Sequence, residues 1–186
     1  MTLHADLTAL LADAGIDDVD VDEAVADEHV RWSAYRRIVA ATAASEHRDS
    51  DRTIVATILR DPEEMVSRSA FVELVDSIAL QTTEPAEFEQ WAAGLGPEID
   101  LLTVEGNREF LHRRMNDWKT YLAIRSGHTP TSAELAAVTD WMQRLLAEES
   151  TSRPVLTLLA ETGRTKKTRN IAKNRASSRA ITDSAS

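Results

Sequence analysis

Two basic tracts in the C-terminal half of the chain hold the residues whose types and spacing best suit a binding chemistry. The first spans residues 108–125, where an apolar stripe at helical spacing leaves basic side chains on the other faces. The second spans residues 164–179 and has seven basic residues and no acidic one. Guanidinium and ammonium groups bind carboxylates and phosphates, so both tracts are candidates for contact with a negatively charged partner. For the first tract, the preferred interpretation is a solvated face of a helix that packs on the core. The candidate partner-binding residues are Arg113, Arg114, Lys166, Lys167, Arg169, Lys173 and Arg175.

The second tract has three alternative uses. It can form a polar cap on the last helices, contact nucleic-acid phosphates, or pair with an acidic protein surface. Residues 13–28, with eight acids and no base, are one such surface, in the same chain or in another copy. The net charge of −10 repels nucleic acid, and no aromatic residue in the tract can stack on bases. The cap and the acidic protein partner are therefore preferred to nucleic acid.

The spacing of the residues gives little support for a metal site or a catalytic site. The five histidines form no pair at metal-ligand spacing, and cysteine is absent. Asp18, Asp20 and Asp22 imitate the start of a calcium-binding loop, but Glu23 replaces its essential glycine and His29 its bidentate glutamate. No phosphate-binding glycine loop or nucleophile motif is present. We therefore expect no catalytic residue, no metal and no cofactor, and a protein that is not an enzyme.

The overall composition indicates what kind of protein carries these residues. Its 186 residues are 42 % hydrophobic and 28 % charged, as in ordinary globular domains. Residues 1–107 carry 23 acids and 7 bases, a net charge of −16, whereas residues 108–186 carry a net charge of +6. The lack of cysteine, of a basic leader and of a long apolar run predicts a cytoplasmic protein with no membrane contact.

Helical periodicity runs along almost the whole chain, and no sustained alternation typical of strands interrupts it. The pattern predicts an all-α fold, with glycine, proline and capping residues as boundaries. Trp32, Trp91, Trp118 and Trp141 have apolar neighbours at helical spacing, and we expect each in the core. The predicted helices span about 3–14, 23–45, 52–60, 63–81, 84–94, 97–125 with a bend near Gly106, 132–149 and 151–161, followed by the basic segment.

The chain also matches itself at a shift of 36 residues. Residues 30–43 align with residues 66–79, with five identities in 14 positions. Weaker matches relate residues 7–13 and residues 155–161 to residues 55–61. Asp61-Pro62 ends one apolar segment and is followed by Val66, Arg68 and Ala70. Val30, Arg31 and Ala34 repeat this order.

These residues resemble the HEAT-repeat family, in which an apolar helix ends in Asp-Pro and Val-Arg-x-x-Ala opens a second helix. The resemblance covers about residues 3–80 and 154–176, and Arg68 stands one position later than the family pattern places its arginine. It implies a right-handed stack of antiparallel helix pairs, an α-solenoid of about 8–9 helices. Some relatives of this kind remove bases from nucleic acid with exposed Trp, Asp and Arg, which leaves a third, less favoured function.

Together these observations predict a single helical-repeat domain over residues 1–163, a basic terminal helix or cap over 164–179 and a disordered end over 180–186. The favoured function is a non-enzymatic protein-protein interaction module or scaffold. It would bind an unidentified protein, with an acidic partner as the favoured kind, through an inter-helix groove or the basic C-terminal edge. The alternative is a nucleic-acid-binding module that uses the same basic edge.

Overall fold

The computed structural model of the chain describes residues 2–178, and all regular secondary structure in that range is helical. The all-α prediction is confirmed, with eleven helices in the described range rather than eight or nine. Within residues 2–178 the chain divides into two compact units, one of residues 2–82 and 86–114 and the other of residues 83–85 and 115–178. The single domain over residues 1–163 stays a prediction, and the predicted disordered end, 180–186, lies outside the described residues.

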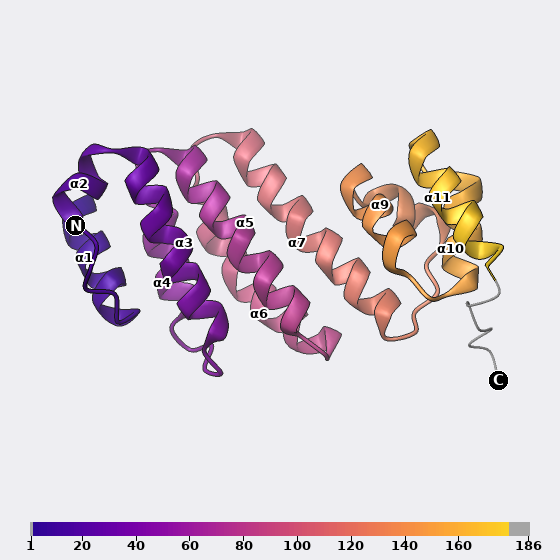
Figure 1. The fold of residues 1–186 in the computed structure, drawn as a ribbon, viewed down its shortest axis with the longest axis horizontal. Helices are drawn as coiled ribbons and strands as arrows, with labels where there is room; N and C mark the ends of the chain where they lie inside the picture. Colours follow the sequence, from indigo (N-terminus) through magenta and orange to yellow (C-terminus); the bar gives the residue numbers. More distant parts are fainter. Residues whose placement is uncertain (1, 179–186) are drawn as a thin grey trace. The chain divides into compact units, whose positions relative to one another are not determined.

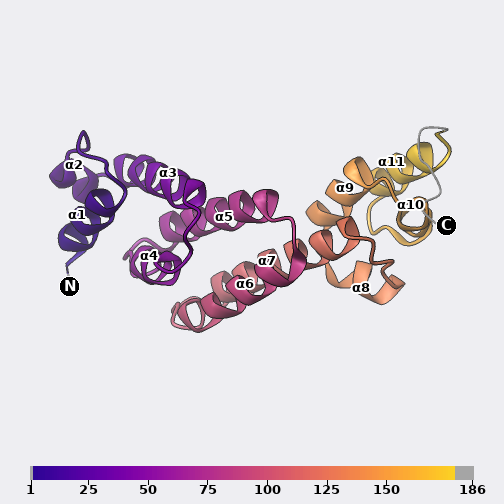
Figure 2. The same cartoon turned by 90° about the horizontal axis from the view of Figure 1, so that it is seen from below.

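The helices of the first unit lie in two layers (Figure 2). Figure 2 shows α3 and α5 in one layer and α1, α4 and α6 in the other. The long helix α7 begins in this unit and ends in the second. The helices are α1 (Leu3–Asp13), α2 (Val21–Ala26), α3 (Glu28–Ala44), α4 (Asp51–Ile58), α5 (Glu64–Gln81), α6 (Pro85–Ile99) and α7 (Glu105–Arg125).

The start of the first unit follows local sequence signals except at one break. The Thr2 side chain caps α1, and Gly15 ends it with a φ of +67°, a conformation that favours glycine. The helix predicted over residues 23–45 is two helices, because Asp27 adopts an extended conformation and caps α3 by accepting from the His29 amide. The short helix α2 lies within the acidic segment of residues 13–28.

The boundary between α6 and α7 was predicted wrongly. We expected helix ends at Gly94 and Gly96 and a new helix from Pro97, but α6 continues through all three residues to Ile99. Burial of Leu95 and Ile99 stabilises this continuation. The Glu64 carboxylate, 40 residues earlier in sequence, accepts from the Thr103 and Val104 amides and so caps the start of α7. A distant side chain thus places a boundary that nearby residues do not signal.

Helix directions support one part of the self-match and not another. α3 and α5 lie side by side in Figure 1 and run parallel, since Arg31 reaches Asp61 just before α5 while Arg36 reaches Glu73 further along it. In contrast, α1 runs antiparallel to α4. Asp6, near the start of α1, pairs with Arg60, which follows the end of α4. The alignment of residues 7–13 with residues 55–61 is therefore not reflected in equivalent helix placement.

The second unit contains the end of α7 and four shorter helices. Thr131 and Glu134 form the predicted capping box at α8. The helix predicted over 132–149 breaks at Val138 and Thr139, because the Thr139 side chain caps α9 while its amide donates to Asp117 of α7. The helices that follow α7 are α8 (Ser132–Ala137), α9 (Asp140–Glu149), α10 (Arg153–Thr162) and α11 (Lys166–Ala176).

Candidate partner-binding site

Five of the seven predicted binding residues lie on α11. This helix packs against α10 and α9 through the buried Thr168 and Ala172. Lys166, Lys167 and Lys173 are exposed, and no described residue pairs with them. The basic terminal segment therefore forms a helix with a lysine-bearing outer face.

The arginines of α11 have structural contacts instead. Arg169 Nη1 donates to the Gly163 carbonyl at 2.6 Å, and Arg175 Nη1 donates to the Ala147 carbonyl at 3.0 Å. These carbonyl groups lie at the C-terminal ends of α10 and α9, where backbone acceptors lack intrahelical donors. Both arginines are half-buried. Their contacts fix α11 to its neighbours and leave less of their charge available to a partner.

Arg113 and Arg114 lie in the first unit, on α7. Arg114 forms a two-point ion pair with Asp76 of α5, with Nε 2.7 Å from Oδ1. Its side chain is only 15 % exposed. Arg113 is exposed and lies 3.7 Å from Glu109, one helical turn earlier. Arg114 therefore joins two helices, and Arg113 is the more accessible of the two.

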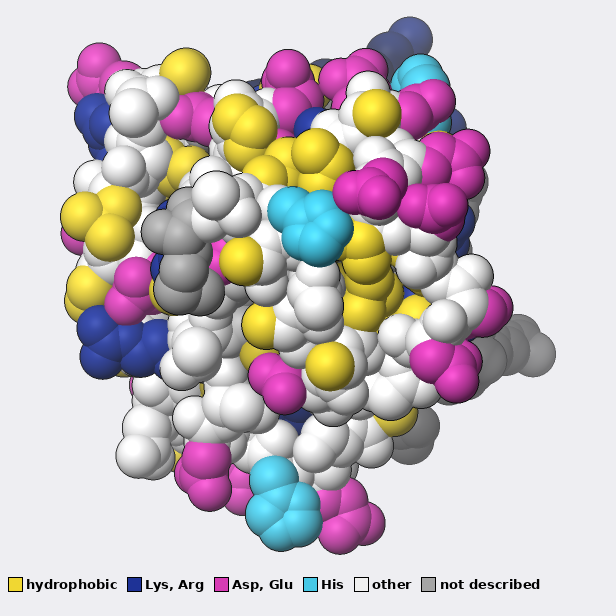
Figure 3. All heavy atoms as spheres, turned by 90° about the vertical axis from the view of Figure 1, so that its left-hand side faces the viewer, with side chains coloured by type: hydrophobic (Ala, Val, Ile, Leu, Met, Phe, Trp, Pro, Cys, Tyr) yellow, Lys and Arg dark blue, Asp and Glu magenta, His cyan; other side chains and the backbone are white. Residues whose placement is uncertain are grey.

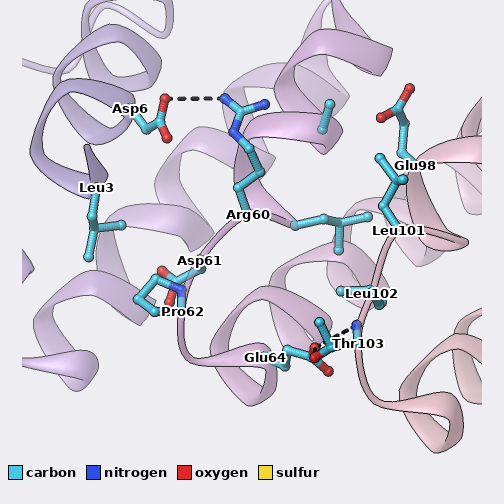
Figure 4. Close-up of a pocket in the computed structure, with 12 residues that line it drawn as sticks. Leu3, Asp6, Arg60, Asp61, Pro62, Glu64, Glu98, Leu101, Leu102 and Thr103 are labelled. Atoms are coloured by element: carbon cyan, nitrogen blue, oxygen red, sulfur yellow. Dashed lines mark hydrogen bonds and ion pairs between the residues drawn. The ribbon is translucent and has the colours of Figure 1, made fainter. Parts of the chain in front are cut away.

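A groove in the first unit contains none of the predicted binding residues. It has a volume of about 560 Å³ and lies where α1 begins, α4 and α6 end and α5 begins (Figure 4). Aliphatic side chains and four carboxylates share its lining with one arginine. The lining residues are Leu3, Asp6, Ala56, Leu59, Arg60, Asp61, Pro62, Glu64, Glu98, Leu101, Leu102 and Thr103.

Two groove carboxylates are each only partly paired. Asp6 Oδ1 lies 3.2 Å from Arg60 Nη2, and Glu98 Oε1 accepts from Arg52 Nε at 2.8 Å. The second oxygen of each carboxylate accepts no hydrogen bond from the described residues. The arginine side chains are 49 % and 61 % exposed, whereas the two acids are 9 % and 14 % exposed. The acids are thus fixed in the walls, and their arginine partners extend into solvent.

The other two carboxylates hold the groove together. Asp61 Oδ2 accepts from Arg31 Nε and from the Tyr35 hydroxyl, both at 2.8 Å, while Oδ1 accepts from the Glu63 amide. Burial, together with the Asp61 charge, raises the pKa of Tyr35 well above its usual value. Arg31 also donates to the Ala24 carbonyl, so one buried ion pair connects α2, α3 and the start of α5.

On the opposite side of the groove, Glu64 connects the start of α5 to the turn before α7. It accepts from the Thr103 amide and hydroxyl, the Val104 amide and the Asn107 amide group. The hydrogen bonds from Thr103 and Asn107 lower the pKa of Glu64. Figure 4 shows this carboxylate directed at the turn before α7. Both ends of the groove are therefore held by charged, hydrogen-bonded side chains.

Exposed aliphatic side chains lie beside these polar contacts. Leu101, in the turn between α6 and α7, is 76 % exposed, while its neighbour Leu102 is 5 % exposed. Met65 and Val104, which adjoin the Glu64 contact in sequence, are about half exposed. Sequence reasoning singled out Asp61-Pro62 but missed this groove, because Asp6, Glu98 and Leu101 belong to no motif. Only the folded unit brings them together.

The tryptophans are less buried than predicted. Trp118 is 2 % exposed, as expected of a core residue, but Trp141 is 40 % exposed and packs edge-on against it. Trp32 and Trp91 are intermediate, and Trp91 Nε1 donates to the buried Asp51 at 2.9 Å. The core prediction is therefore wrong for Trp141. Helical spacing alone does not distinguish a tryptophan at the edge of the core from one at its centre.

Acidic side chains dominate the N-terminal end of the first unit. All eight acids of residues 13–28 are exposed. Figure 3 looks onto this end and shows acidic groups around its edges with hydrophobic side chains between them. Asp18 pairs with Arg37 at 2.6 Å, which lowers the pKa of Asp18, and Asp20 caps α2. Within residues 2–178, no group of three or more potential ligands is arranged to hold a metal ion.

Comparisons with protein-family models, with curated proteins and with solved structures gave no match. No helix in the described part of the chain combines the length and apolar character needed to cross a bilayer. The candidate binding surfaces are therefore the groove of the first unit and the lysine face of α11 in the second.

Proposed function

We propose that the chain is a helical protein-interaction module that binds a partner through the groove of the first unit. The observation that carries this proposal is the exposed Leu101 beside two wall carboxylates, each with an oxygen that accepts no hydrogen bond. Exposed aliphatic groups next to directional polar groups are typical of protein interfaces. The buried contacts of Asp61 and the four hydrogen bonds that Glu64 accepts support a groove that is formed before a partner binds, which reduces the ordering cost of association.

The proposal includes a HEAT-like stack of helix pairs as its scaffold. The parallel α3 and α5, which carry the 36-residue match, support this part. In such stacks successive helix pairs expose an extended surface to partners. A cytoplasmic location is part of the same proposal and rests on the absence of cysteine.

Selection from a random peptide library tests the proposed site. Twelve-residue peptides displayed on phage would be selected on the wild-type protein after depletion on the Leu101→Ser variant. The side chain is 76 % exposed, so this change should leave the fold intact. We expect enriched peptides that bind the wild type and not the variant. A selection that enriches no peptide dependent on Leu101 would contradict the proposal.

The lysine face of α11 favours nucleic acid as a second candidate. Lys166, Lys167 and Lys173 are exposed and unpaired within the described chain. Three phosphate contacts would make the logarithm of affinity fall with the logarithm of salt concentration at a slope of about 2.7. A gel shift with a duplex at low and moderate salt tests this candidate. The nucleic-acid candidate requires binding at low salt that disappears when all three lysines are replaced by glutamine. If the duplex does not shift even at low salt, this candidate is overturned.

A further inference from the structure

We infer that the occupant of the groove is a protein segment in which a lysine or arginine side chain stands next to an aliphatic side chain. This inference rests on the proposed function and adds the chemistry of the partner. It follows from the aliphatic lining, the carboxylates in the walls and the acceptor capacity of their oxygens.

The aliphatic part of the segment has a contact surface between α1 and the turn after α6. Leu3, Leu59 and Leu102 line the groove, and the exposed Leu101 stands at its edge in Figure 4. A partner side chain packed here would remove apolar surface from water, which favours binding. An aliphatic group fits better than a wholly polar segment because the aliphatic lining offers no hydrogen bonds to side chains.

The charges in the groove walls determine the charge of the residue that should stand next to this aliphatic side chain in the partner segment. The lining carries four carboxylates and one guanidinium group. Arg31 and Arg52, outside the lining, offset Asp61 and Glu98, and Arg60 offsets Asp6. Arg108, also outside the lining, donates to the Leu102 and Thr103 carbonyls and offsets Glu64. The charged groups in the lining itself are nevertheless mostly carboxylates, so a basic segment matches them better than an acidic one.

Hydrogen-bonding capacity agrees with this preference. Asp6 Oδ2 and Glu98 Oε2 can each accept from an incoming guanidinium or ammonium group, since an ionised carboxylate has acceptor capacity on both oxygens. Two helices end at the groove and two begin there, so the partial charges of the helix ends favour neither sign. The two carboxylate oxygens are therefore the groups that select a donor.

Three synthetic peptides of equal length test the inference. Each has two leucines that flank three identical residues in a Gly/Ser background, and these three residues are lysine, glutamine or glutamate. Fluorescence anisotropy with the full chain would measure their affinities. At low salt we expect the lysine peptide to bind about tenfold more tightly than the glutamine peptide, with a smaller difference at 300 mM salt because ions screen exposed charges.

Matched variants identify the place of binding. Glu98→Gln removes a groove charge and should weaken the lysine peptide about fivefold, whereas Glu89→Gln, on the exposed part of α6 away from the groove, should not. Leu101→Ser should abolish binding, whereas Leu80→Ser, at a side chain 58 % exposed near the other end of α5, should not. Thermal melting would show that all four variants remain folded.

The outcomes separate this inference from the proposed function. Glutamine or glutamate peptides that bind as tightly as the lysine peptide, and still depend on Leu101, would overturn the charge preference and leave the groove as the binding site. A lysine peptide that fails to bind would also overturn the inference. Binding that ignores Leu101→Ser but responds equally to Glu89→Gln and Glu98→Gln would show nonspecific attraction and contradict it.

Discussion

Asp61 joins α3 to the start of α5 through a buried ion pair. Its carboxylate lies between Arg31 and Tyr35, and both groups of the ion pair are almost fully buried. Burying charges costs free energy that only good geometry and additional hydrogen bonds offset. The Glu63 amide and the α2 carbonyls supply those hydrogen bonds. Removal of one partner therefore lowers the free energy of unfolding by more than the small net contribution of the intact ion pair.

We expect Asp61→Ala to lower the free energy of unfolding by about 3–5 kcal/mol, because it leaves Arg31 charged and buried without its partner. Tyr35→Phe removes a single hydrogen bond to the same carboxylate and should cost about 1 kcal/mol. Urea denaturation followed by circular dichroism measures both. Equal effects of the two substitutions would show that the ion pair does not bear on stability.

Asp51 gives the first unit a dependence on pH. Burial raises the pKa of this carboxyl above its usual value of 3.8, although Trp91 and Arg48 donate to it. Oδ1 is buried, and no described residue forms a hydrogen bond with it. A carboxyl whose pKa is higher in the folded state favours folding when protonated. That contribution is present at pH values below the unfolded pKa and is lost as pH rises through the folded pKa.

Asp51→Asn tests this sign. The variant is uncharged at every pH, so its free energy of unfolding relative to the wild type should increase as pH rises from about 3.8 toward neutrality. Denaturation at several pH values measures the difference, with Glu89→Gln, an exposed site, as control. A difference between Asp51→Asn and the wild type that stays constant with pH would refute the assignment.

At the scale of helices, local signals predicted boundaries well where the capping residue is a sequence neighbour. Thr131 with Glu134 and Gly15 are examples. They predicted wrongly where a distant carboxylate fixes the start of a helix, as Glu64 does for α7 and as Asp117 does for α9 by accepting from the amide of the capping residue Thr139. Such partners lie 22 to 43 residues away in sequence. No pattern within one helix reports them.

The repeat alignment shows the same limit in another form. Shifting Arg31 by 36 positions gives Ser67, which is fully buried, while Arg68 turns outward to Asn107 and stacks over Phe110. The displacement of the arginine by one position was visible in the sequence. Its consequence, a contact with α7 in place of a buried ion pair, depends on a helix that the repeat pattern does not include.

Glu64→Ala should fray the start of α7, because the Thr103 and Val104 amides lose their acceptor. We expect a loss of about 1–2 kcal/mol of unfolding free energy, as for other helix caps, and faster hydrogen exchange of those amides. Glu63→Ala, at the preceding exposed residue, is the matched control. Unchanged exchange in Glu64→Ala would mean that this cap is dispensable.

The contact between α3 and α5 has its own test. Ala34 and Ala70, which occupy equivalent positions in the 36-residue match, are 1 % and 0 % exposed. Glutamate at either position would be buried without a partner, so each substitution should cost more than about 3 kcal/mol. Ala40→Glu, on the exposed side of α3, should be nearly neutral. Variants at Ala34 and Ala70 that melt at the wild-type temperature would contradict the observed helix faces.

At the scale of the whole molecule, the all-helical class and the charge segregation could be predicted from the sequence, but the placement of the favoured binding surface could not. The basic residues attracted attention because they are contiguous, yet Arg114, Arg169 and Arg175 make contacts within their own units. The groove residues are spread over about 100 positions. Composition cannot reveal a surface whose parts meet only after folding.

The central claim is that this groove binds a protein segment. The most direct test is the effect of replacing Leu101 on peptide affinity. The affinity of library-selected peptides would be compared between the wild type, Leu101→Ser and the control Leu80→Ser, with anisotropy as the readout. We predict binding to the wild type and to Leu80→Ser, and at least a tenfold loss for Leu101→Ser. Equal affinities for all three proteins would contradict the claim.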